Sequence, residues 1–280
     1  MKRYFLNIFF LLCISNGLFA QGDLLVNPVR VVFDGNISNE DINLTNIGND
    51  TAIYVINFQH YKMLEDGNFV PNPKPDSLSA DHLLRLFPRK VKLAPEESQT
   101  IRLQLRKPSG LKPNEYRSHI YFRAEKNQPK GFDMRPNDSL RMAVRISPVF
   151  GISIPVFVQH GDLEVNTTLS DLNIEAVNDS TSMLKMLINR TGTKSAFGNI
   201  KVVYVPEKGS KFEIAMVNGV AVYPEISKRW FSLPIRMTNQ MKLSNAKLLI
   251  KYTVPGAGAE KIITQAELQL RLANTNPQTN

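Results

Sequence analysis

Apolar and polar residues alternate with a period of two along most of this chain. The segments 42–45 and 100–105 are short examples, in which every second side chain is apolar. This alternation is typical of a half-buried β-strand, and no segment after residue 20 keeps a helical period for more than about three turns. The sequence therefore predicts an all-β chain.

The predicted strands form two groups, because the pattern breaks at Gln159 to Asp162. Separators rich in Gly, Pro, Asn and Asp lie between the strands. The first group comprises 24–33, 42–46, 52–61, 90–93, 100–105, 117–124 and 140–158, and the second comprises 172–177, 183–189, 200–205, 221–223, 232–235, 246–252 and 262–272. Each group predicts one immunoglobulin-like β-sandwich, so we expect domains at 21–158 and 159–273 and a polar tail at 274–280.

Within the first group, 63–82 and 125–139 are predicted to be long loops, and loops of this length are usually functional or mobile. In the second group, we expect Tyr223, Trp230 and Phe231 to build the core of the domain.

The first 20 residues have the layout of a cleaved secretory signal, with Lys2 and Arg3 ahead of an apolar run and Ala20 at its end. The run is too short to span a bilayer, and no later stretch approaches the ~20 residues that a membrane helix needs. Cleavage would lower the net charge from +9 to +7 and remove Cys13, the single cysteine. We therefore expect a soluble exported protein without a disulfide or a redox-active cysteine.

The remaining positive charge does not predict a nucleic-acid partner. Basic residues are spread over strands and loops without interleaved aromatic residues, which is typical of a solvated strand face.

Signals for catalysis or metal binding are weak. The histidines, at 60, 82, 119 and 160, are far apart, and neither an HExxH pair nor a GxSxG turn is present. The segment Thr191 to Ser195 lacks the leading glycine of a phosphate-binding loop, and Glu96 and Glu97 lie in a predicted turn. We expect neither an enzyme nor a cofactor. An exported hydrolase, with carboxylates that meet only in the folded structure, stays as an alternative.

One strand has the pattern of an unpaired sheet edge. A long loop precedes it and Pro148 follows it, and proline is confined mainly to edge strands and bulges. Its apolar positions alternate with Arg141, Ala143, Arg145 and Ser147. An ordinary half-buried strand would show the same alternation, but an apolar edge with free backbone groups needs a partner. The apolar positions are Leu140, Met142, Val144 and Ile146.

The order of segments resembles the PapD-like periplasmic chaperones of pilus assembly, in their divergent branch. The resemblance lies in NPVRVVF at 27–33, FPRKVKLAPEESQTIRLQLRKPSGLKPNEYRSHIYF at 87–122 and GISIPVFV at 151–158. It implies a periplasmic binding protein with its two domains joined at an angle. Its partner would be a pilus or fimbrial subunit. The resemblance leaves open whether an outer-membrane usher is a second partner and whether the free protein caps its own edge by forming a dimer.

The resemblance also assigns roles to residues. Leu140, Met142, Val144 and Ile146 would fill the groove of an incomplete subunit by donor-strand complementation. Arg30 would anchor the C-terminal carboxylate of the subunit, a task that suits its bidentate guanidinium.

The family's second anchor, a lysine, is replaced here by Phe150 or Val149, which leaves Arg145 or Arg102 as basic substitutes. The alternative from another class is a structural or assembly component of a surface organelle.

Overall fold

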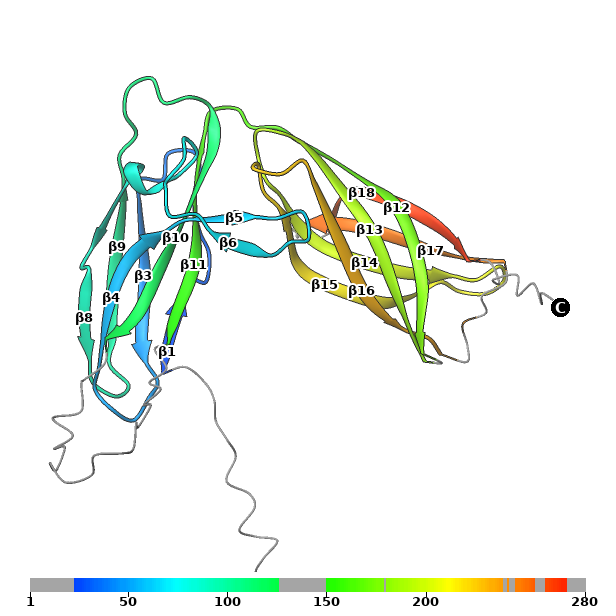
Figure 1. The fold of residues 1–280 in the computed structure, drawn as a ribbon, viewed down its shortest axis with the longest axis horizontal. Coiled ribbons are helices and arrows are strands. Elements are labelled where there is room, and N and C mark those ends of the chain that lie inside the picture. Colours follow the sequence, from blue (N-terminus) through cyan, green and yellow to red (C-terminus); the bar gives the residue numbers. More distant parts are fainter. Residues whose placement is uncertain are drawn as a thin grey trace, which may run out of the picture.

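The chain folds into two β-sandwiches that are set at an angle (Figure 1). This computed structural model describes residues 23–125, 150–178, 180–238, 241, 245–254 and 260–270. The expected signal segment 1–20 and polar tail 274–280 lie outside these residues. The prediction of an all-β chain with two immunoglobulin-like sandwiches is confirmed.

The first sandwich packs a four-stranded sheet, in the order β1-β3-β9-β7, on a five-stranded sheet, in the order β2-β11-β10-β4-β8. Neighbouring strands are antiparallel, except that β2 and β11 are parallel. The strands are β1 Leu24–Asn27, β2 Val31–Phe33, β3 Asn39–Asn46, β4 Ala52–Gln59, β7 Leu84–Phe87, β8 Lys90–Leu93, β9 Ser98–Leu105, β10 Asn114–Glu125 and β11 Gly151–His160.

The alternation along these strands decides which face is buried. Ile101, Leu103 and Leu105 of β9 are buried, whereas the side chains between them are exposed. Ile42 and Leu44 of β3 are buried in the same way. Each large apolar side chain buried like this contributes ~1.5–3 kcal/mol, so the predicted pattern also identifies the core.

The N-terminal strand expected at 24–33 is divided into two strands. β1 pairs with β3 in one sheet, and β2 pairs with β11 in the other. Pro28 lies between them and has no N–H for a strand ladder, so pairing is interrupted there. The chain crosses between the sheets at this point, which places Arg30 directly before β2.

The second sandwich has a three-stranded sheet, in the order β12-β13-β16, and a four-stranded sheet, in the order β15-β14-β17-β18. No helix in the described part of the chain is long and apolar enough to cross a membrane. The strands are β12 Val165–Asn178, β13 Thr181–Gly192, β14 Ala196–Val205, β15 Phe212–Val222, β16 Lys228–Arg236, β17 Ala246–Val254 and β18 Lys261–Leu270.

The expected aromatic core of this domain is only partly right. Phe231 packs against the core, but Trp230 is 48% exposed. Tyr223 is buried in a separate apolar cluster with Met63 and Phe157 of the first sandwich. It therefore contributes to the contact between the sandwiches.

The segment 63–82, which the sequence predicts as a loop, is partly structured. It completes a hairpin of β5 Tyr61–Met63 and β6 Phe69–Pro71, and it leads into a short 3-10 helix, η1 Asp81–Leu83. Gly67 turns the hairpin with a φ of 84°, a conformation that favours glycine. The hairpin reaches from the first sandwich to the second (Figure 1).

Candidate functional site

Polar side chains line the face of the five-stranded sheet that is turned toward the second sandwich. Glu115, Arg117 and His119 occupy alternate positions of β10 and therefore share this face. Arg117 lies opposite Phe157 of β11, and Phe157 lies beside Val32 of β2. This face and the parts of the second sandwich that contact it form what we call the junction.

Arg30 lies between two aromatic rings that come from different sandwiches. Its guanidinium carbon is 3.9 Å from the centroid of the Phe157 ring and 4.1 Å from that of Phe197 on β14. Both distances are well within the ~6 Å at which a ring attracts a cation. The N–H groups of a guanidinium point outward in its plane, so a hydrogen-bond acceptor reaches Arg30 in that plane, where Tyr223 already makes a side-chain hydrogen bond.

The surroundings of Arg30 make its charge costly. Burial lowers the pKa of the Arg30 guanidinium from its ordinary value, although nearby Tyr223 and Glu115 act in the opposite direction. Arg117 adds to the lowering of this pKa by repulsion. Arginine stays protonated in proteins, so the group is a partly exposed cation that an additional anion would stabilise.

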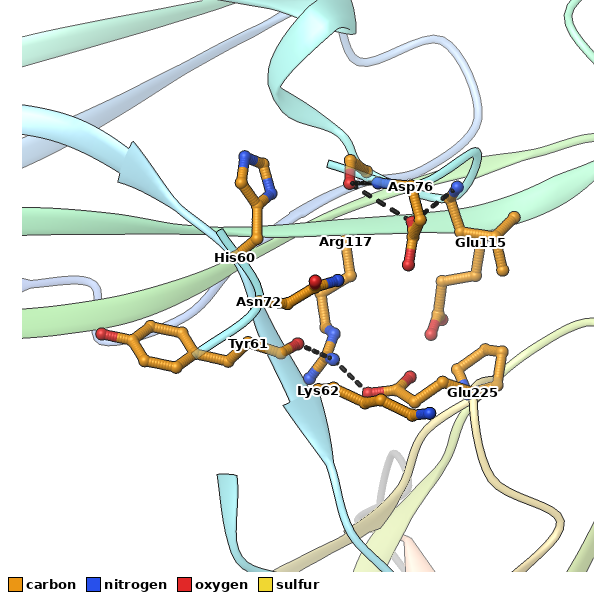
Figure 2. Close-up of a pocket in the computed structure, with 11 residues that line it drawn as sticks. His60, Tyr61, Lys62, Asn72, Asp76, Glu115, Arg117 and Glu225 are labelled. Atoms are coloured by element: carbon orange, nitrogen blue, oxygen red, sulfur yellow. Dashed lines mark hydrogen bonds and ion pairs between the residues drawn. The ribbon is translucent and has the colours of Figure 1, made fainter. Parts of the chain in front are cut away.

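Arg117 forms an ion pair with Glu225 of the second sandwich (Figure 2). Its Nη2 also donates a hydrogen bond to the Tyr61 carbonyl at 2.9 Å, and Glu225 accepts one from the Met63 amide at 3.0 Å. The two charged side chains are only 8% and 19% exposed. The pair therefore connects β10, the hairpin and the second sandwich in surroundings with little water.

Glu115 makes a second polar link across the junction. Its residue is 1% exposed, and its carboxylate accepts hydrogen bonds from Gln159 Nε2 at 2.9 Å and from the Ser195 amide at 3.2 Å. The Glu115 amide donates to the Thr193 carbonyl at 3.3 Å. Each carboxylate oxygen has a donor, so the buried charge is compensated.

Arg190 of β13 holds the second sandwich's side of the junction together. This buried guanidinium donates to the carbonyls of Gly192, Lys194, Pro224 and Ile226 at 2.8, 3.0, 3.2 and 3.2 Å. These bonds connect the turn that carries Glu225 to the segment that precedes Ser195.

The hairpin contacts the second sandwich through its backbone. The Trp230 amide donates to the Glu65 carbonyl at 2.6 Å, and Lys228 lies 3.6 Å from the Glu65 carboxylate. A Cβ at Gly67 would lie 2.4 Å from Arg229 Nε. The turn therefore favours glycine through its positive φ, and a larger residue would also have to displace the Arg229 guanidinium.

A cavity of about 330 Å³ opens beside these contacts, and Figure 2 shows the side chains that line it. Its acidic groups are Asp76, Glu115 and Glu225. Asp76 accepts hydrogen bonds from the Leu78 amide and the Ser79 hydroxyl, and the other two carboxylates make the links described above. No group of three potential metal ligands occurs among the described residues. All three carboxylates of the cavity are thus engaged in hydrogen bonds or ion pairs within the protein.

His119 is buried beside the hairpin. It is 8% exposed, and its ring contacts those of Tyr61 and Phe69 at centroid distances of 4.9 and 5.9 Å. Its Nδ1 has no hydrogen-bond partner among the described residues. Burial lowers the pKa of His119 to about 3, and the charges of Arg117 and His60 add to this effect.

We expect His119→Gln to reduce the loss of stability in acid. The native imidazole stays neutral down to about pH 3, whereas an unfolded histidine takes up a proton below about pH 6.5. The unfolded state therefore binds more protons between these values, and the free energy of unfolding falls by up to ~1.4 kcal/mol per pH unit as pH falls. Urea unfolding at several pH values in this interval measures the slope. An equal slope in wild type and variant would contradict the assignment.

The structure describes two of the three predicted anchor residues, Arg30 and Arg102, and these two lie apart. Arg30 lies at the junction, whereas Arg102 is exposed on β9 of the other sheet, where its Nε donates to Asp41 at 3.0 Å. Arg145 lies outside the described residues. The same is true of the predicted donor residues Leu140, Met142, Val144 and Ile146.

The described part of β11 has a free edge next to Arg30. β10 pairs with β11 from Gly151 to His160, but β2 pairs on the other side only from Val156 to Val158. In the part of the chain that the structure describes, residues 151–155 have no partner strand on that side. An unpaired edge of this kind is a template for the addition of a strand from another chain.

The structure is similar over most of its length to solved pilus-assembly chaperones. It matches the class 5 fimbriae chaperone CfaA with a TM-score of 0.45 at 18% identity, over 85% of this chain and 97% of that one. It matches a chain of the CsuC-CsuE chaperone-tip adhesion subunit complex of Acinetobacter baumannii with a TM-score of 0.45 at 13% identity, over 88% and 98%. The E. coli chaperone DraB gives 0.42 at 12% identity, over 88% and 96%. No family model and no curated relative matches the sequence.

Sequence reasoning named Arg30 as a candidate but did not name the residues that surround it in the structure. The polar residues Glu115, Arg117 and His119 alternate within a strand, and that alternation indicates a polar sheet face. The contributions of Glu225 and Phe197 carry no comparable signal, because they lie far along the chain in the other domain.

Proposed function

We propose that this protein is a periplasmic chaperone that binds pilus or fimbrial subunits in the cleft between its sandwiches. The observation that carries the proposal is the position of Arg30, which lies between the rings of Phe157 and Phe197 and next to the edge that is free in the described part of β11. The resemblance of NPVRVVF and GISIPVFV to the PapD-like chaperones supports the same function.

Binding would use two kinds of contact. A subunit that lacks a strand would pair with the free edge, and the apolar positions at 140–146 would fill its groove. Arg30 would hold its C-terminal carboxylate through charge-assisted hydrogen bonds, which are roughly twice as strong as neutral ones. Arg145 is proposed as the second basic residue. Neither contact uses a cofactor or a covalent step.

The proposal is tested by recovering the tagged protein from the periplasm of its own host and identifying bound proteins by mass spectrometry. A small secreted β-rich protein in equimolar amount supports a chaperone. Recovery of the chain alone contradicts it, and so does its incorporation into purified surface fibres, which would indicate the structural component instead.

We expect Arg30→Ala to lower recovery of the subunit at least about tenfold, because charge-assisted hydrogen bonds contribute ~1.5–3 kcal/mol each. Arg30→Lys keeps the charge but loses the bidentate geometry, so its recovery should be intermediate. Quantitative mass spectrometry of the co-purified subunit measures the effect.

Arg102→Ala is the matched control, since this arginine is exposed on the other sheet. Circular dichroism checks that all variants are folded. Normal recovery with folded Arg30→Ala would refute the anchor role.

A further inference from the structure

The ring that covers one face of Arg30 belongs to the second sandwich, although Arg30 belongs to the first. Phe197 lies near the start of β14, opposite Ala221 of β15. It is 37% exposed, whereas Phe157 is fully buried among Val32, Met63 and Tyr223. The Phe157 side of the stack is therefore fixed by packing within the junction, and the Phe197 side depends on how the sandwiches are docked.

We propose that Phe197 is a positioning residue that orients Arg30 for edge-on binding of a carboxylate. This inference rests on the proposed function but concerns a different residue and a different domain. With the Phe157 and Phe197 centroids 3.9 and 4.1 Å from its carbon, the guanidinium has little room to stack on a third group. A planar carboxylate that approaches in the guanidinium plane can form two parallel N–H···O bonds, and this geometry is specific to arginine.

The surroundings of Arg30 also increase the stabilisation that such an anion would provide. Burial lowers the pKa of the Arg30 guanidinium, since water is partly excluded, and Arg117 repels the same charge. An anion in the plane would relieve both effects. A carboxylate has the charge and the shape for this contact. Such a group is present at a chain terminus and in the side chains of Asp and Glu.

The anchor is consequently a two-domain site. Arg30 and Phe157 alone leave one face of the guanidinium uncovered, and the side chain has several rotatable bonds through which to turn away. Contact with Phe197 restricts that freedom before the ligand arrives, and such preorganisation lowers the entropic cost of binding.

The test uses NMR of the mature protein, with the Arg30 Nε–H signal assigned from the spectrum of Arg30→Lys. The probes are sodium acetate, uncharged acetamide, N-acetyl-trialanine with a free C-terminus, its C-terminal amide, and an acetyl-Ala-Asp-Ala amide. We expect acetate to shift the Arg30 signal and acetamide to leave it unchanged. The peptides distinguish a terminal from a side-chain carboxylate.

The decisive variant is Phe197→Leu, which keeps an apolar side chain but removes the ring. We expect its Kd for acetate to rise about three- to tenfold, in line with the usual strength of cation–π contacts. Phe197→Tyr restores a ring and should restore the wild-type Kd. Phe212→Leu is the matched control, because Phe212 is 38% exposed in the same sandwich and its ring contacts that of Tyr204, at a centroid distance of 5.3 Å.

The result is separable from the chaperone proposal. Equal Kd values in wild type and Phe197→Leu, or no response of Arg30 to any carboxylate, overturn the positioning role even if a subunit co-purifies. A Kd that depends on the Phe197 ring supports the positioning role of Phe197 even if no subunit is found. In that case only the chaperone proposal would be refuted. A rise in Kd with an unchanged urea midpoint excludes a purely structural effect.

Discussion

Arg117→Ala is expected to destabilise the protein by about 3 kcal/mol and to release the hairpin from the second sandwich. The substitution leaves Glu225 largely buried without its cation, and removal of one partner from such a pair typically costs ~3–5 kcal/mol. The Tyr61 carbonyl also loses a donor, and the Tyr223 ring loses a cation that lies 4.0 Å from its centroid.

Two measurements check this expectation. Urea unfolding gives the loss of stability, and limited trypsin digestion gives the rate of cleavage after Lys62, which lies in β5 of the hairpin. Arg123→Ala is the matched control, because Arg123 lies on the same strand and face but is exposed. An equal effect of both substitutions would show that the Arg117 ion pair is not what holds the junction.

A double substitution separates the effect of the two charges on stability from the effect of the side-chain volume. Arg117→Met combined with Glu225→Met removes both charges and keeps much of the apolar volume. Buried ion pairs replaced in this way are often neutral or more stable. We therefore expect the double variant to be more stable than Arg117→Ala.

Val144→Asp is expected to abolish the complex with the subunit. In the proposed mode of binding, Val144 enters an apolar groove, where an unpaired carboxylate would cost several kcal/mol. A loss of this size lowers affinity at least about 100-fold. Because Val144 is proposed to contact the subunit and not the core of its own domain, the free protein should remain folded.

Ala143→Asp is the control, since position 143 belongs to the opposite set of the alternating pattern. It adds the same charge to the same strand and should leave most of the complex intact. Pull-down of the subunit with each variant, beside circular dichroism of the free protein, measures the difference. A complex that survives Val144→Asp would remove these apolar positions from the mechanism.

The sequence predicts the class of fold because alternation is a local property. The buried positions of β3 and β9 can be read directly from the apolar residues at 42, 44, 101, 103 and 105. The division of the first strand is harder to predict, since apolar residues stand on both sides of Pro28 and the buried positions change phase there, from 24 and 26 in β1 to 31 and 33 in β2. Only the pairing partners show that β1 and β2 belong to different sheets.

The hairpin had a signal that the prediction of a long loop did not use. Asp66 and Gly67 form a turn dipeptide between two short segments with apolar residues, which is a typical hairpin pattern. Three-residue strands with Pro71 at the end of one are weak evidence for a sheet on their own. They are ordered here by contacts with Trp230 and Glu225, which no local pattern reveals.

The candidate site shows the same limit. Arg30 could be proposed from its strand and from the family resemblance, but its two rings come from positions that the sequence does not connect. Phe197 looks like an ordinary strand residue until the second sandwich is placed against the first. Stacking of this kind is a property of the tertiary structure.

The hairpin also limits how freely the two sandwiches can evolve. Its carbonyl at Glu65 and its glycine at position 67 fit against residues 229 and 230 of the other domain. A first sandwich transplanted onto a different second sandwich would lose this fit along with the partner of Arg117. A substitution on one side of the junction is therefore expected to be tolerated only where the contacting residues of the other sandwich can adjust to it.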